Sequence, residues 1–340
     1  MADTPRLPDR WRAPRTYVLP QRRAMRVLRR GVWTVCWSAI ALASGPAVGR
    51  QMEVTSELGV TAVVLAPYAA FAAVVAEIGL LSLRRSRSAM AGALMVALVA
   101  AAQLPAFIPA RRPPSDMGLT VMTSNIRLGL ADPDAVVALI ALHQVDVLAI
   151  QELTGPAVSR LHKSGLDSLM PYRVISPHEA GAGVGIWSRL PLTDTAVLDG
   201  FGFDPLRAQL NVSGRVFTFV CFHSKAPLYN GGTEQWMSDL RRLAQAMIGM
   251  PAPVLVAGDF NATRDHKQFR DLLSNGFNDA ADDAGAGVLP TYPADRSFGP
   301  IASLDHVVLS PDLVGVRVQT AKVGGSDHRA VIARVSMVSS

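Results

Sequence analysis

The stretch Val254-Leu-Val-Ala-Gly-Asp-Phe-Asn-Ala-Thr263 carries the clearest structural signal in this sequence of 340 residues. Residues 254–257 are apolar without interruption, which predicts a strand buried on both faces. Gly258 ends the run, and Asp259 and Asn261 follow in a turn where both side chains can converge on one point. An Asp-x-Asn turn can also be a simple cap between a strand and a helix, so a functional interpretation depends on other stretches.

Five further apolar runs carry polar side chains at one end. Residues 145–150 are followed by Gln151 and Glu152, and a carboxylate at the end of a buried strand is a hard oxygen ligand of the kind that Mg²⁺ prefers. The other polar groups are Asn125 after Met122-Thr-Ser, His223 after residues 216–222, the pair Asp305-His306, and Ser326-Asp327-His328. Six strands with polar groups at one rim favour a functional site over a set of unrelated caps.

These residues resemble the motifs of the endonuclease/exonuclease/phosphatase superfamily, which includes deoxyribonuclease I, exonuclease III, neutral sphingomyelinases and inositol polyphosphate phosphatases. The combination of Gly-Asp-Phe-Asn with a later Ser-Asp-His at a strand start is the most specific part. The matching pieces span residues 117–335 and are Asn125, Gln151-Glu152, Gly185-Ile-Trp-Ser-Arg-Leu-Pro191, His223, Gly258-Asp-Phe-Asn261, Asp305-His306 and Ser326-Asp-His328.

The resemblance implies an α/β fold in which two packed sheets form a sandwich with outer helices. The pattern of the chain agrees with it, because strands alternate with helical stretches such as residues 133–143 and 233–248. In the second stretch, Trp236, Leu240, Leu243 and Met247 recur at helical spacing, which predicts core packing.

Hydrolysis of a phosphodiester or a phosphomonoester requires a metal ion, a base that activates water, and a group that stabilises the leaving oxygen. We expect Glu152 to be a direct ligand of Mg²⁺, or of Mn²⁺ as a substitute, with Asn125 and Asp327 in the same metal shell. Asp259 is expected to orient or deprotonate the attacking water, and Asn261 to hold that water or a phosphoryl oxygen.

Two histidines complete the expected site. The resemblance implies that His328 pairs with Asp305, which would keep the imidazole cationic against the phosphate. His223 is expected to assist the leaving group, although a histidine can also simply close its strand.

The sequence departs from the family pattern at two positions. Arg127 stands where the abasic-site endonuclease branch has a second acidic ligand, which argues against a two-metal scheme and against DNA-repair specificity. His306 stands where several relatives have an aromatic residue, and we interpret it as a packing residue or as a support for the site.

The first third of the chain has a different composition. Residues 1–30 contain nine arginines interspersed with prolines, which predicts a disordered basic tail. Three apolar runs follow, residues 31–48, 58–83 and 89–108. Because they are apolar on all faces and close to the roughly 20 residues that cross a hydrocarbon core, we expect about three transmembrane helices before the sandwich.

Two features of these runs leave alternatives open. Residues 31–43 also fit a signal peptide, since basic residues precede them and Ala41-Leu-Ala43 resembles a cleavage site. Glu77 lies inside the second run and fits either an ion or proton path or a pairing with the nearby Arg84 and Arg85.

A Pro-Pro linker separates the membrane region from the rest. We assign residues 109–116 to the linker and residues 117–340 to the catalytic domain. The first 116 residues carry 15 Lys and Arg against 6 Asp and Glu, whereas the remainder carries 18 against 21. A catalytic domain with this small acidic excess gives no argument from basicity for nucleic acid.

Three functions fit these observations. The first is a membrane-anchored, magnesium-dependent phosphoesterase resembling nucleases, and the second is a lipid phosphodiesterase of the sphingomyelinase type. The third is a non-catalytic binding module on the same fold. The expected partners are a phosphoester substrate, such as a nucleic acid or a phospholipid, and the lipid bilayer; no motif implies a protein partner.

Arginine counts beside the apolar runs predict the orientation of a multi-pass protein in the cell membrane. The tail holds nine arginines and residues 82–88 hold three, whereas residues 49–57 hold one. Because basic loops stay cytoplasmic, the catalytic domain is expected on the extracytoplasmic side.

Overall fold

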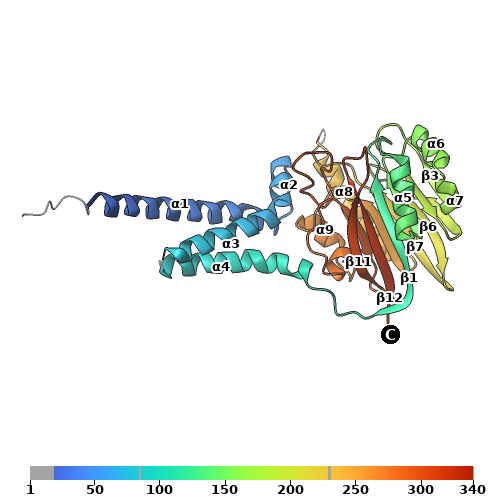
Figure 1. The fold of residues 1–340 in the computed structure, drawn as a ribbon. Helices are drawn as coiled ribbons and strands as arrows, with labels where there is room; N and C mark the ends of the chain where they lie inside the picture. The colour runs from blue at the N-terminus through green and yellow to red at the C-terminus, as the bar shows by residue number, and fades with distance from the viewer. Residues whose placement is uncertain (1–18, 84–85, 229–230, 340) are drawn as a thin grey trace, which may run out of the picture.

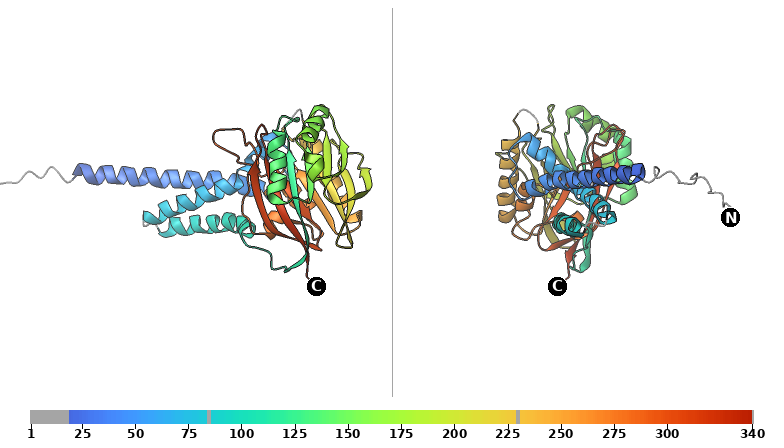
Figure 2. Two further views of the ribbon diagram at one scale, coloured as in Figure 1. Left: turned by 45° about the vertical axis from the view of Figure 1, so that its right-hand side comes forward. Right: turned by 90° about the vertical axis from the view of Figure 1, so that its left-hand side faces the viewer.

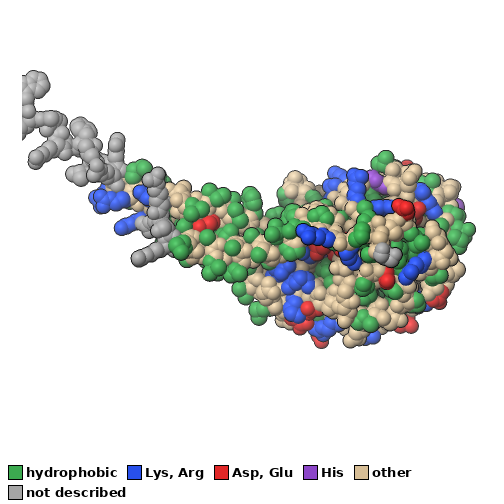
Figure 3. Space-filling model, turned by 90° about the horizontal axis from the view of Figure 1, so that it is seen from below, with side chains coloured by type: hydrophobic (Ala, Val, Ile, Leu, Met, Phe, Trp, Pro, Cys, Tyr) green, Lys and Arg blue, Asp and Glu red, His purple; other side chains and the backbone are tan. Residues whose placement is uncertain are grey.

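The computed structural model describes residues 19–83, 86–228 and 231–339, which form a helical bundle joined to a two-sheet body (Figure 1). The N-terminal elements are α1 (Leu19–Gly49), α2 (Glu57–Val64), α3 (Ala66–Ser82), α4 (Ser86–Gln103) and the 3-10 helix η1 (Leu104–Phe107). Helices α1, α3 and α4 lie side by side and extend away from the body, whereas α2 lies against it (Figures 1 and 2). Hydrophobic side chains cover much of the bundle surface (Figure 3).

By length and composition, two helical segments can cross a membrane, Arg23–Gly49 and Ala89–Phe107. The second expected span, residues 58–83, is not one helix. It is divided into α2 and α3, which meet at Leu65 with a bend of 56°, and only the two helices together are long enough to cross a membrane. Pro67 explains the break, since its ring nitrogen cannot donate to the preceding turn of α2.

Two expected boundaries also change. Helix α1 starts at Leu19, so the prediction of disorder is wrong for residues 19–30, while residues 1–18 lie outside the described part of the chain. The expected linker, residues 109–116, ends earlier than predicted, because the first strand already begins at Pro114.

Two six-stranded sheets build the body, with the orders β11-β12-β1-β2-β4-β3 and β5-β6-β7-β8-β10-β9. The first contains β1 (Pro114–Asn125), β2 (Val147–Gln151), β3 (Tyr172–Ser176), β4 (Val184–Ser188), β11 (Leu313–Lys322) and β12 (Arg329–Val338). The second contains β5 (Leu192–Val197), β6 (Leu206–Val212), β7 (Arg215–His223), β8 (Val254–Asp259), β9 (Asn278–Asp279) and β10 (Asp305–Leu309). The predicted two-sheet α/β sandwich is confirmed.

One cluster of buried apolar side chains fills the space between the sheets, and others pack under the outer helices. Helices α8 (Thr233–Gly249) and α9 (Lys267–Leu272) cover the second sheet, and α5 (Pro133–His143), α6 (Gly155–Lys163) and α7 (Leu166–Leu169) cover the first. The short α10 (Ala280–Asp283) lies near β11. The predicted stripe of α8, from Trp236 to Met247, is buried in the core.

The body holds the bundle through buried polar contacts. Arg50, just after α1, pairs with Asp265 at 2.6 Å between Nε and Oδ1, and Gln103 at the end of α4 donates to the same oxygen at 2.7 Å. Val60 and Val63 of α2 belong to the apolar core under α8 and α9. The connection between α1 and α3 and the end of α4 are therefore parts of one packed junction with the body.

Candidate active site

Strand register brings the predicted polar residues together. Each sheet has one parallel pair, β1 with β2 and β7 with β8, and the carboxyl ends of these pairs align Asn125 with Gln151 and His223 with Asp259. Strand β10 runs antiparallel to β8 and places Asp305 opposite Asp259. The close approach of β8 to β7 requires Gly258, since a Cβ there would lie 1.8 Å from the carbonyl oxygen of Phe222.

Asn125 lies at the centre of the cluster and links the two sheets. Its Nδ2 donates to Glu152 Oε1 and to Asp259 Oδ2, both at 3.0 Å. The Ser326 hydroxyl donates to the Asn125 carbonyl at 2.7 Å, which ties the late Ser-Asp-His segment to the end of β1. Residues separated by up to 201 positions thus meet at one rim.

Glu152 lies half-buried in a left-handed backbone conformation with φ of 57°. Its second oxygen, Oε2, accepts a hydrogen bond from the Leu128 amide at 2.7 Å. Each carboxylate oxygen therefore keeps one further lone pair. Asn125 presents its Nδ2 to Glu152, whereas its Oδ1 accepts from the Arg127 amide at 2.9 Å and also keeps one lone pair. Carboxylate and carboxamide oxygens are the donors that Mg²⁺ takes in proteins, so these two residues fit such an ion.

Asp259 and Asn261 form the turn after β8. The Asn261 backbone amide donates to Asp259 Oδ1 at 2.9 Å, and its side-chain nitrogen donates to the Ser224 carbonyl at 2.9 Å. Asn261 also adopts a left-handed conformation, with φ of 47°. These bonds fix both side chains and leave the Asn261 carboxamide oxygen for a ligand.

His328 and Asp305 form a buried pair, with 2.8 Å between Nδ1 and Oδ2. The other ring nitrogen of His328 lies 3.7 Å from Asp259 Oδ2. Burial alone would disfavour the imidazolium, but the carboxylates of Asp305 and Asp259 outweigh it and raise the pKa of His328 to about 10. His328 therefore carries a positive charge at neutral pH.

Asp259, Asp305 and His328 also form the one group of potential metal-ligating His, Cys, Asp and Glu side chains among the described residues, with donor atoms within 4.8 Å of one another. Three of the carboxylate oxygens and one ring nitrogen already take part in hydrogen bonds, since Asp305 Oδ2 binds His328 Nδ1 and both oxygens of Asp259 accept from Asn125 and Asn261. We therefore interpret this group as a hydrogen-bonded acid–base cluster rather than as the metal site.

His223 approaches Asp259 from β7. Its Nδ1 lies 3.1 Å from the Gly181 carbonyl, to which it donates, and its Nε2 lies 3.7 Å from Asp259 Oδ2. The Phe203 ring packs against the imidazole with 5.0 Å between ring centroids. This arrangement presents Nε2 to the cluster.

Asp327 is placed differently from the other predicted ligands. Its carboxylate lies 3.7 Å from Arg127 Nε, and Arg127 also pairs with Asp295 at 3.2 Å. Within the described residues, the hydrogen bonds of Asn125 and Glu152 do not include Asp327. The metal role of Asp327 stays a prediction.

The structure adds residues that the sequence patterns did not indicate. Tyr292 packs on His328 with 4.9 Å between ring centroids, and the Ala294 amide donates to the Asp327 carbonyl at 2.6 Å. Gly181 and Ser224 supply backbone carbonyls to His223 and Asn261. These residues lie in loops without hydrophobic periodicity, so only the Tyr-Pro dipeptide at Tyr292 gave any local signal.

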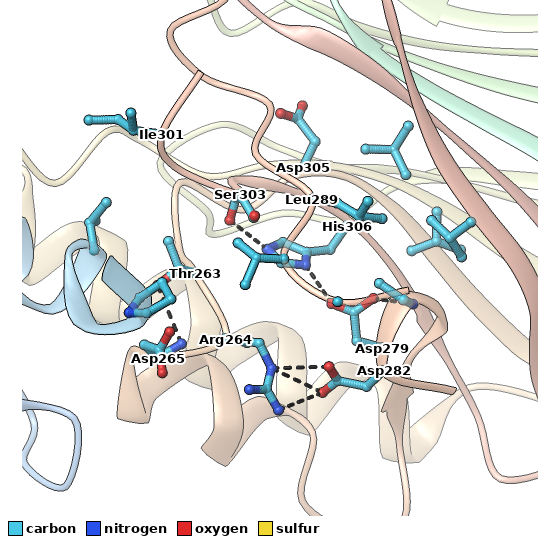
Figure 4. A pocket seen from close by; sticks show the side chains of 18 residues that line it. Thr263, Arg264, Asp265, Asp279, Asp282, Leu289, Ile301, Ser303, Asp305 and His306 are labelled. Atoms are coloured by element: carbon cyan, nitrogen blue, oxygen red, sulfur yellow. Dashed lines mark hydrogen bonds and ion pairs between the residues drawn. The ribbon is translucent and has the colours of Figure 1, made fainter. Parts of the chain in front are cut away.

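Another buried histidine, His306, lies on the other side of β10. Figure 4 shows the Asp305 carboxylate turned away from the His306 ring, and below them the ion pair of Arg264 with Asp282. His306 Nδ1 lies 2.6 Å from Asp279 Oδ2, and Nε2 lies 2.9 Å from the Ala262 carbonyl. Burial lowers the pKa of His306, but Asp279 outweighs this and raises it above its ordinary value. His306 is thus a support under the site.

The fold and the cluster define a class of protein, an α/β sandwich with an acidic, histidine-containing site at the carboxyl ends of its parallel strands. The family model described as Endonuclease/Exonuclease/phosphatase family matches residues 122–328, which is more than half of the chain. The chain belongs to this family, whose members are generally hydrolases of phosphoester bonds.

Several solved structures are similar. Humanized Danio rerio TDP2 with 14 mutations is 18% identical, with a TM-score of 0.55 over 65% of this chain and 99% of that chain. A family protein from Beutenbergia cavernae is 20% identical, with a TM-score of 0.53 over 65% of this chain and 72% of that one. A family protein from Bacteroides vulgatus is 18% identical, with a TM-score of 0.52 over 65% of this chain and 100% of that one. These likenesses show the fold alone, and no curated protein matches the chain.

Proposed function

We propose that this protein is a membrane-anchored hydrolase of phosphoester bonds that depends on a divalent metal ion. The observation that carries the proposal is the convergence on Asp259 of Asn125, His223 and His328, which come from different strand ends and lie within 3.7 Å of its Oδ2. A binding module would not need a carboxylate, a cationic imidazole and a second histidine around one point.

The metal ion would be held by Glu152 and Asn125, whose oxygens fit Mg²⁺ or Mn²⁺. When bound, such an ion neutralises charge on the phosphoryl oxygens. Of the three expected ligands, Asp327 would contribute least to binding the ion, because its carboxylate is paired with Arg127. Family enzymes typically use divalent metals, which supports this assignment.

The protein's own groups carry the proton transfers. Asp259 accepts a proton from the attacking water, whose oxygen bonds to phosphorus, while Asn261 holds the water or a phosphoryl oxygen. Positively charged His328 faces the phosphoryl group and is fixed by Asp305. His223 donates a proton from Nε2 to the leaving oxygen as its bond to phosphorus breaks, and Gly181 fixes its other nitrogen.

A substrate panel tests this function. The full-length protein in detergent micelles should hydrolyse at least one of plasmid DNA, RNA, phospholipids and inositol phosphates with Mg²⁺, and chelator should remove the activity reversibly. Nucleic acid belongs in the panel because the similar Danio rerio TDP2 has been solved with a single-strand DNA product. Glu152→Gln is the inactive control, and activity that persists in excess chelator would end the metal assignment.

We also propose that the catalytic domain lies on the extracytoplasmic side. Arg50 and Gln103 both bind Asp265, which supports placing residues 49–57, the loop after α1, on the same side of the membrane as the domain. Arg29 donates to the Leu83 carbonyl at 2.6 Å, which brings the basic start of α1 beside the end of α3, at the end of the bundle far from the domain. Basic segments stay cytoplasmic, which gives the orientation.

Reporter fusions test this orientation. Alkaline phosphatase is active only when exported, so a fusion after Ser340 should be active, whereas a fusion after Ser86 at the start of α4 should be inactive. A well-expressed but inactive fusion after Ser340 would place the domain in the cytoplasm.

A further inference from the structure

An apolar groove lies where the bundle meets the catalytic domain. Its volume is about 430 Å³. The groove, here called the junction groove, is lined by Phe71 and Val74 of α3, Leu104 and Phe107 of η1, and Val288 and Pro290 of the catalytic domain. Phe71, Leu104 and Phe107 are each more than half exposed. In the proposed orientation the groove opens at the outer end of the membrane-spanning helices, where bilayer lipids lie.

The segment Pro290–Tyr292, here called the strip, connects this groove to the cluster around Asp259. Pro290 lines the groove, and Tyr292, two residues later, packs on His328 at 4.9 Å between ring centroids. The strip is fixed at Tyr292, which pairs with Ala302, and the Tyr68 hydroxyl of α3 donates to the carbonyl of the adjacent Ile301 at 2.9 Å. One elongated molecule can therefore contact His328 and the junction groove together.

The loops around the site favour an amphiphile over a polynucleotide. Leu128 and Leu130 after β1 are 47% and 64% exposed, and Phe298 in the facing loop is 68% exposed. Arg127, which lies between these loops, is already paired with Asp295 and Asp327. A polynucleotide needs a track of free cationic side chains along its backbone, whereas a lipid headgroup needs only one anion site beside an apolar surface.

We propose that the junction groove binds a hydrocarbon chain of a membrane lipid whose phosphoester group is the substrate of this site. The proposal rests on the proposed function and adds the substrate class. The lipid comes from the bilayer around α3 and α4, since these helices form one wall of the groove.

Two chromogenic phosphodiesters that differ only in chain length test the proposal on the full-length protein in micelles. These are p-nitrophenyl dodecyl phosphate and p-nitrophenyl methyl phosphate. The wild type should prefer the dodecyl compound in kcat/KM by at least about tenfold, the effect of removing roughly two methylene groups from water. Val74→Trp should fill the groove and abolish the preference. Val75→Trp, at the 53% exposed next position, is the matched control and should keep it.

A photoreactive, diazirine-bearing phosphatidic acid gives a readout that does not depend on turnover. Its crosslinks should map to the groove, persist in Glu152→Gln and be lost in Val74→Trp. The lipid assignment is overturned if Val74→Trp and Val75→Trp retain equal preference and crosslinking, or if plasmid DNA is cleaved while neither lipid probe reacts. Groove crosslinks without hydrolysis of any phosphoester would instead overturn the proposed function and leave the lipid site standing.

Discussion

Asp305 and His306 are neighbours on β10, yet they belong to two histidine–carboxylate pairs on opposite faces of the strand. In the first pair, His328 binds Asp305 and its free nitrogen faces Asp259 at the rim. In the second pair, His306 binds Asp279 while its other nitrogen donates to the carbonyls of Ala262 and Ser303. The pairs have the same chemistry, but only the first keeps a ring nitrogen for a substrate. The surroundings, not the residue types, separate a reactive pair from a structural one.

The largest expected effect is on turnover through the first pair. His328→Gln keeps a donor toward Asp305 but loses the charge, so kcat should fall by at least about a hundredfold with little change in unfolding temperature. Initial rates and thermal unfolding of the same preparation would show this. A near-normal rate would mean that the two pairs do not differ as described.

The second pair should show the reverse pattern. His306→Ala leaves the buried Asp279 carboxylate unpaired, which should cost about 3–5 kcal/mol in the free energy of unfolding. The remaining folded protein should turn over at close to the wild-type rate, because His306 does not face the rim. Denaturant unfolding with parallel rate measurements checks both statements, and a hundredfold rate loss without destabilisation would reverse the assignment of the pairs.

His266 differs from the histidines of both pairs, because it must be uncharged in the folded protein. His266 Nδ1 accepts from the Thr263 amide at 2.9 Å and Nε2 lies 3.1 Å from the Val60 carbonyl of α2. Burial lowers the pKa of His266 to about 4. As pH falls below 6.5, the ordinary pKa of histidine, the unfolded chain binds a proton before the folded protein does, so the folded protein loses stability.

At pH 5 this loss should reach about 2 kcal/mol relative to neutral pH. The unfolding free energy of the wild type and of His266→Gln, measured at pH 7.5 and 5.0, would isolate it, since the variant lacks the titrating group. Equal pH dependence in both proteins would show that His266 does not titrate in this way.

The rim was predictable from the sequence because each of its residues borders an apolar strand. Asn125 and Asp259 end strands and Glu152 follows one, while Asp305 opens a strand and His328 directly precedes one. Parallel strands bring such ends together. Tyr292 was not predictable, since its contact with His328 depends on the path of a long loop. The pairing of Asp327 with Arg127 was also hidden, because adjacency in a motif does not fix a side-chain direction.

The N-terminal helices were predictable only in outline. The apolar composition of residues 58–83 runs through the position where the structure bends, so hydropathy alone predicts one helix. Pro67 was the available signal for the bend. The contact between Arg50 and Asp265 spans 215 positions, and no local pattern reports such a pairing.

The most direct test of the central claim is the rate of phosphoester hydrolysis by Asp259→Asn, compared with the wild type in Mg²⁺ and in chelator. Asparagine keeps the size of the side chain and one acceptor oxygen, so it can retain one of the two hydrogen bonds from Asn125 and Asn261, but it cannot accept a proton from water. We predict a loss of at least about a hundredfold in kcat in a variant that still folds and unfolds cooperatively. A near-normal rate for Asp259→Asn on a substrate that the wild type hydrolyses with Mg²⁺ would contradict it.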